Sequence, residues 1–160
     1  MKLHKLIPEY LHKKNIKKFY QLYFNKKETK THFNYEKNLF TRHAFINRAI
    51  KKFKNCKYLE IGVASNRVFN TIPLKLKNKF GVDPAQGGNF RMTSDEFFEK
   101  YPEEKFDVIF IDGLHHYDQC QKDAINALKK LNESGIILFH DFLPRAELEQ
   151  KIPQNYGTWS

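Results

Sequence analysis

The chain has 160 residues, of which 41% are hydrophobic, enough for one domain with a single core and too few for two. The two cysteines, Cys56 and Cys120, are far apart, which argues against a zinc ribbon or a disulfide framework and predicts two free thiols. The formal charge of +10 is uneven: residues 1–60 hold 16 basic and 4 acidic residues, and residues 61–160 hold 12 and 14.

The sequence shows no membrane-spanning or export segment. No apolar run approaches the roughly 20 residues of a bilayer span, and residues 1–14 lack the apolar centre of a signal peptide. We therefore expect a cytoplasmic protein.

The basic N-terminal third allows two interpretations. Its lysines could lie on a nucleic acid or on an anionic membrane face. Alternatively, they form a solvated helical surface, which we favour because 23 lysines against 5 arginines is what an A/T-rich coding sequence produces. No basic and aromatic RNA-binding signature accompanies the lysines, so a nucleic-acid partner is not expected.

Two helices are predicted before the first strand. Residues 8–25 form an imperfect amphipathic helix opened by Pro8, residues 26–34 a polar linker, and residues 35–53 a second helix. We divide the chain into a basic helical extension, residues 1–34, and a domain, residues 35–160.

Strands and helices then alternate along the domain. The pattern predicts strands at 57–63, 79–83 and 91–93, a short helix at 66–72, and a helix capped by Ser94 that runs to Lys100.

The segment from 105 to 144 predicts a strand, a crossover helix and a strand. Residues 106–111 and 135–139 are continuous apolar runs, and Ala124, Leu128 and Leu131 recur at helical spacing between them. Such a unit requires a parallel sheet.

Acidic and imidazole side chains follow both strands of this unit. Ligands of open parallel sheets bind outside the carboxyl ends of the strands. We therefore expect one functional edge that carries Asp112, His115, His116, His140 and Asp141.

The first strand ends in LEIGVASN, which places Glu60, Gly62 and Ser65 where a ligand can approach the backbone. Asp83 follows Gly62 by 21 residues, about where an acidic residue binds ribose hydroxyls in nucleotide-binding sheets. The alternative is that Gly62 only makes a turn and that Asp83 caps Pro84. A dinucleotide site is disfavoured because GVASNR has a single glycine.

Five motifs in order, YLEIGV, GVDP, TSDEFF, FDVIFIDGLHHYDQ and GIILFHDFLP, resemble the class I S-adenosylmethionine-dependent methyltransferases. The similarity covers about residues 56–144 and is greatest to the small-molecule O-methyltransferase branch. It implies an α/β, Rossmann-like three-layer sandwich, preceded by N-terminal helices, with a mostly parallel sheet of strand order 3-2-1-4-5.

The resemblance also implies a cofactor site. Glu60 and Gly62 would line the methionine and ribose side of S-adenosylmethionine, Asp83 would hold the ribose diol, and Ser94 and Asp95 would lie near the adenine. The whole expected cofactor-binding set is Glu60, Gly62, Ser65, Asp83, Ser94, Asp95 and Asp112.

Related O-methyltransferases hold a divalent ion at positions matched here by Asp112 and Asp141. Adjacent strands lie about 4.8 Å apart, so carboxylates at neighbouring strand ends can share a cation. Oxygen ligands favour Mg²⁺, and His140 would shift the preference toward manganese, iron or zinc. Consecutive strand residues face opposite ways, so we favour Asp141 over His140. The alternative is that Asp112 caps a turn and His140 is a core histidine.

Methyl transfer to a hydroxyl requires a base, and His115 matches the histidine of I-D-G-x-H, with His116 as the second candidate. The alternative for both is a solvated loop histidine.

The chain also departs from the family. It has only one glycine in the first turn and no pair of strands after residue 139, which suggests a truncated or reduced form whose exposed sheet edge favours a homodimer. The leading hypothesis is an S-adenosylmethionine-dependent methyltransferase that methylates an oxygen of a small, sugar-like acceptor, and the requirement for a metal ion stays open. The alternatives are a non-catalytic cofactor-binding protein and a nucleic-acid methyltransferase.

Overall fold

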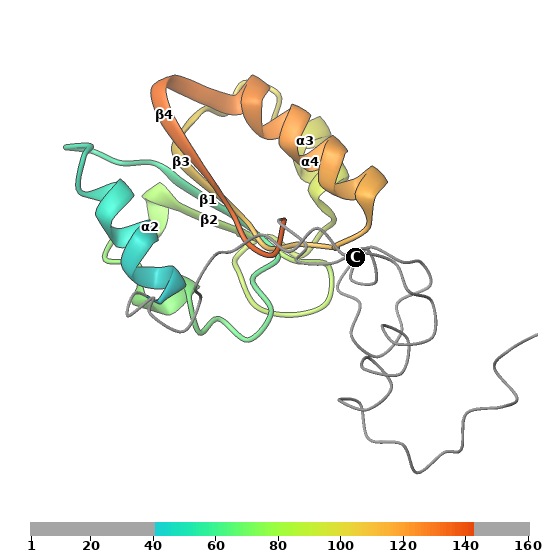
Figure 1. Ribbon diagram of the computed structural model, residues 1–160, viewed down its shortest axis with the longest axis horizontal. Coiled ribbons are helices and arrows are strands. Elements are labelled where there is room, and N and C mark those ends of the chain that lie inside the picture. The colour runs from blue at the N-terminus through green and yellow to red at the C-terminus, as the bar shows by residue number, and fades with distance from the viewer. Residues whose placement is uncertain (1–40, 143–160) are drawn as a thin grey trace, which may run out of the picture. The chain divides into compact units, whose positions relative to one another are not determined.

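The structure, a computed structural model, describes residues 41–142 (Figure 1). In this part of the chain, strands and helices alternate in the order α2 (Arg42–Ile50), β1 (Tyr58–Ile61), η3 (Phe69–Thr71), η4 (Leu76–Asn78), β2 (Lys79–Val82), α3 (Ser94–Lys100), β3 (Phe106–Ile111), α4 (Tyr117–Lys130) and β4 (Leu131–Phe139). The predicted helix at 8–25, the linker at 26–34 and the start of the helix at 35–53 lie outside the described residues.

The described strands form one parallel sheet in the order β2-β1-β3-β4. This confirms the α/β, Rossmann-like class. The predicted third strand at 91–93 is wrong: only an isolated bridge between Val82 and Phe90 lies beside β2. Without that strand, the predicted order of the remaining four agrees with the observed one.

Helices cover both faces of the sheet, as Figure 1 shows, with α2 on one face and α3 and α4 on the other. Side chains along each strand alternate between two cores. One core joins Tyr58, Val108 and Phe110 to Ile46 of α2. The other contains Leu59, Ile61, Ile109 and Ile111 with Phe97 of α3 and Ala127 of α4. Full burial of each large apolar side chain stabilises the fold by about 1.5–3 kcal/mol.

Helix α3 begins one residue earlier than the predicted Ser94 cap implied. Thr93, not Ser94, is the N-cap: its hydroxyl accepts the N–H of Glu96, and the Glu96 carboxylate accepts the N–H of Thr93. This reciprocal pair is a capping box, and T-S-D-E is its sequence signature. The predicted helix at 66–72 is also reduced, to the single 3-10 turn η3.

The crossover helix α4 buries a different face from the one its leucines suggested. Leu128 is 65% exposed and Ile125 is 46% exposed, whereas Asp123 and Ala127 are buried. Gln119, one turn before Asp123, donates from Nε2 to its Oδ1 at 3.1 Å. Gln119 also lies 3.2 Å from Ser94 and Asp95 of α3, so polar residues take part in the contact between the two helices, and the apolar spacing of α4 alone predicted the wrong face.

Two expectations from composition can be compared with the described part. Cys56 is buried and Cys120 is half-buried, and both are free thiols, as predicted. No helix between residues 41 and 142 has the length and apolar character needed to cross a membrane.

Candidate site at the carboxyl edge of the sheet

The carboxyl ends of β1, β3 and β4 present polar side chains on the face that α2 covers. Because alternate residues share a face, Asp112 continues the row of Val108 and Phe110, and His140 continues that of Ile136 and Leu138. The register that pairs Ile111 with Phe139 makes Asp112 and His140 neighbours. The structure thus places His140, rather than the favoured Asp141, against Asp112.

Asp112 is the centre of a charged cluster. Its Oδ2 accepts a hydrogen bond of 2.6 Å from Nη1 of Arg42, while its Oδ1 lies 3.0 Å from Nδ1 of His140 and 3.6 Å from Nε2 of His115. Burial alone would raise the pKa of Asp112, but the two histidines and Arg42 outweigh it and lower the pKa to about 2. Asp112 is therefore a carboxylate at neutral pH.

His115 approaches Asp112 through one ring nitrogen and leaves the other without a partner. Nε2 faces the carboxylate, which favours a proton on that atom, and Nδ1 is buried with no hydrogen-bond partner among the described residues. The neighbouring carboxylate raises the pKa of His115. His116 instead occupies the N-cap position of α4, where its carbonyl accepts the N–H of Cys120. The structure therefore brings His115, the first candidate base, to Asp112.

The predicted metal ligands do not form a fitting donor set. Oδ2 of Asp112 is bound by the Arg42 guanidinium, and Nδ1 of His140 lies between Oδ1 of Asp112 and Oδ2 of Asp141, 3.0 and 3.3 Å away. The described residues contain no group of three or more His, Cys, Asp or Glu side chains arranged to hold an ion. The residues present do not fit the expected divalent cation.

Asp83, the expected ribose ligand, links two loops. Its Oδ1 accepts the N–H groups of Ala85 and Gln86, both at 2.8 Å, and its Oδ2 accepts that of Ala64 at 2.9 Å. Burial alone would raise the pKa of Asp83, but these backbone donors and Arg91 lower it. A carboxylate oxygen accepts about two hydrogen bonds, so Oδ2 retains room for one hydroxyl and Oδ1 for none.

Gly62 is required by close packing rather than by an open ligand path. Its φ is +82°, and a Cβ there would lie 2.1 Å from the carbonyl oxygen of Asp112. Ala64 and Asn66 also have positive φ, and Oδ1 of Asn66 accepts the N–H of Gly88. The loop after β1, which includes the exposed Ser65, is therefore tied to the loop after β2 and to the end of β3.

Glu60 lies inside the structure, 1% exposed. The hydroxyl of Tyr58 donates to its Oε2 at 2.7 Å. Burial is the main cause that raises the pKa of Glu60 to about 7. The carboxyl group is thus poised between its neutral and charged forms near neutral pH.

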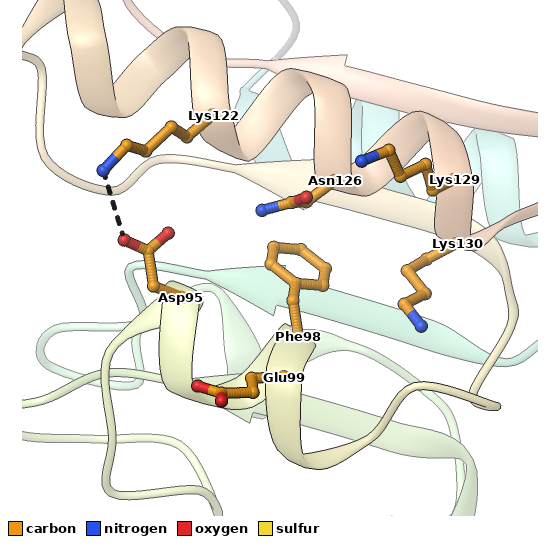
Figure 2. A pocket seen from close by; sticks show the side chains of 7 residues that line it. All are labelled: Asp95, Phe98, Glu99, Lys122, Asn126, Lys129 and Lys130. Carbon is orange, nitrogen blue, oxygen red and sulfur yellow. Dashed lines mark ion pairs between the residues drawn. The ribbon is translucent and has the colours of Figure 1, made fainter.

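The residues expected near the adenine are held by α4. Nε2 of Gln119 lies 3.2 Å from both Oγ of Ser94 and Oδ1 of Asp95. Asp95 also forms an ion pair with Lys122 at one end of a groove of about 490 Å³ between α3 and α4, which Figure 2 shows. The sequence analysis missed Gln119 and Arg42; the motif FIDGLHHYDQ contains Gln119, but no local pattern marks Arg42.

The chain can also be compared with known proteins. Residues 73–142 match the family described as "Methyltransferase domain", a range that extends from Pro73 through the end of β4. No curated protein and no solved structure gives a significant match. Residues 73–142 are thus similar to a family of methyltransferase domains, which supports the resemblance to class I S-adenosylmethionine-dependent methyltransferases carried by the motifs.

Proposed function

We propose that this protein transfers a methyl group from S-adenosylmethionine to an oxygen of a small acceptor. The observation that carries the proposal is that Asp112 and His115 lie together at the carboxyl edge of the parallel sheet. Residues 73–142, which supply three of its strands, match a methyltransferase family. Ligands of such sheets bind at this edge.

S-adenosylmethionine would supply a methyl group activated by its sulfonium. The chain's own groups fit a cofactor of this kind. Oδ2 of Asp83 can accept one ribose hydroxyl, whereas Glu60, buried against Tyr58, is not proposed to contact the cofactor. Ser94 and Asp95, held by Gln119, remain the candidates for the adenine side.

His115 is the proposed base. With Nε2 directed at Asp112, Nδ1 keeps a lone pair that can take the proton of an acceptor hydroxyl as its oxygen bonds to the methyl carbon. The carboxylate of Asp112 stabilises the resulting imidazolium. His116, which occupies the N-cap position of α4 and, unlike His115, forms no ion pair with Asp112 in the described part of the chain, is not proposed for this role.

The acceptor is proposed from the chemistry of the base and from analogy with the family that the motifs resemble. A hydroxyl is the group that an imidazole base serves, and sugars are the first class to test because the motifs resemble the small-molecule branch. The same fold supports many substrates, so this step is analogy.

Calorimetric titration with S-adenosylmethionine tests the cofactor. The parent should bind one equivalent, and Asp112→Asn should weaken binding about tenfold, a loss of about 1.4 kcal/mol. Asp118→Asn is the matched control, because Asp118 is exposed in the first turn of α4. A parent that does not bind the cofactor would defeat the proposal.

Turnover is tested by the release of S-adenosylhomocysteine with a panel of small sugars and phenols. His115→Gln should reduce kcat by about a hundredfold or more without changing cofactor affinity, and His116→Gln should leave both unchanged. Cofactor binding with no turnover on any acceptor would instead favour the non-catalytic alternative.

A further inference from the structure

The Asp112 cluster contains a cation from outside the methyltransferase match. Arg42 is the first residue of α2, 70 residues from Asp112, yet its Nη1 lies 2.6 Å from Oδ2 of that carboxylate. The Arg42 side chain is 42% exposed and that of Asp112 is 16% exposed. The guanidinium therefore covers the more buried partner from the solvent side.

The two oxygens of Asp112 have separate partners. Oδ2 is held by Arg42, and this contact turns Oδ1 toward Nδ1 of His140 and Nε2 of His115. A short bond between charged groups restrains a carboxylate strongly. Without it, the carboxylate could rotate about its last torsion and lose its orientation toward the two rings.

The same contact disfavours a divalent ion. A metal ion binds carboxylate oxygens at about 2.0–2.2 Å, and here it would face the positive guanidinium on Oδ2. The second predicted carboxylate, Asp141, lies against His140 instead, with Oδ2 3.3 Å from Nδ1.

We propose that Arg42 is the positioning residue of this site: it supplies the positive charge that the predicted metal ion would have supplied and fixes Asp112 so that Oδ1 serves His115 and His140. The significance of this arrangement for methyl transfer rests on the proposed function. The contacts of Asp112 with Arg42 and the two histidines are independent of that function.

Two measurements that need neither cofactor nor acceptor test the proposal on the full chain. The first is Mn²⁺ titration followed by electron paramagnetic resonance. The parent should show no one-to-one site that depends on Asp112. A one-to-one site in the parent that Asp112→Asn removes would overturn the proposal.

The second measurement records the imidazole ¹⁵N signals of the histidines. Arg42→Gln should shift the signals of His115 and His140, because Asp112 loses the contact that orients it. Arg42→Lys, which keeps the charge, should retain most of the parental pattern. Arg48→Gln, on an exposed residue of the same helix, is the matched control and should change neither signal.

If Arg42→Gln leaves both imidazole signals unchanged, Arg42 does not position Asp112 and the proposal is wrong. In that case the cofactor titration could still succeed. If instead the titration fails and the imidazole signals shift as expected, the proposed function falls while the role of Arg42 stands.

Discussion

Asp83 and Asp112 follow the ends of two strands that flank β1, yet the structure holds them in different ways. Three backbone N–H groups from two neighbouring loops bind Asp83. Asp112 is instead surrounded by side chains, from Arg42 of α2 and from the two histidines. Backbone donors fix a loop, whereas side chains can reorganise around a ligand. The comparison suggests that Asp83 mainly stabilises the loops at this edge of the sheet, whereas Asp112 mainly takes part in the chemistry there.

The largest expected effect comes from a substitution at Gly62, which packs the loop after β1 against the end of β3. Gly62→Ala places a Cβ 2.1 Å from the Asp112 carbonyl oxygen at a φ of +82°, and should lower the free energy of unfolding by about 4 kcal/mol or more. Urea unfolding measures this loss. Gly113→Ala is the control, because its nearest contact would be Cγ2 of Ile61 at 3.3 Å, without positive φ. Equal losses in the two variants would contradict the account.

Asp83→Asn tests the backbone-bound side of the comparison. The variant keeps one acceptor oxygen for three N–H donors and should lower the free energy of unfolding by about 3 kcal/mol. Asp107→Asn, at the opposite edge of the sheet, is the control: Asp107 accepts one backbone N–H and one side-chain amide, and its loss should cost about 1 kcal/mol. The prediction is wrong if Asp83→Asn destabilises the protein no more than Asp107→Asn does.

Glu60→Gln tests the buried carboxyl between them. Tyr58, Asp112, Lys79 and Arg42 are the charged or titratable groups that act on it. Burial raises the pKa of Glu60 from 4.5 to about 7. The contribution of Glu60 to the free energy of unfolding is therefore fully present below pH 4.5 and is lost as the pH rises through 7. Glutamine does not ionise.

The variant should therefore match the parent near pH 4.5 and exceed its free energy of unfolding by about 3 kcal/mol at pH 8. Urea unfolding at both pH values measures the difference. A difference that does not change with pH would show that Glu60 is not held neutral by burial.

The smallest expected effect on stability is that of Asp112→Asn. The half-exposed Arg42 can turn to water when its partner is lost, and the burial cost of the carboxylate disappears, so the free energy of unfolding should fall by about 1 kcal/mol or less. Urea unfolding beside the cofactor titration checks this contrast. A loss as large as that of Asp83→Asn would erase the distinction between the two carboxylates.

How much of this the sequence could predict depends on how local each cause is. The apolar runs of β1 and β3 predict a parallel sheet, and the local pattern after β2 already allows Asp83 to cap its own loop. Arg42 could not be found, because only tertiary packing brings α2 to a carboxylate 70 residues away. The buried face of α4 was misjudged for a related reason: Gln119 contacts Ser94 and Asp95 of α3, and the spacing of the leucines does not reveal such tertiary contacts.

The central claim is that S-adenosylmethionine binds at the carboxyl edge of the sheet. It is tested most directly by backbone amide NMR spectra recorded with and without the cofactor. The account predicts shifts concentrated in residues 62–66, 84–90, 94–95 and 112–116, with little change at residues 102–107 on the opposite edge. Shifts confined to the opposite edge or to residues 122–130 of α4, or no shifts at all, would contradict it.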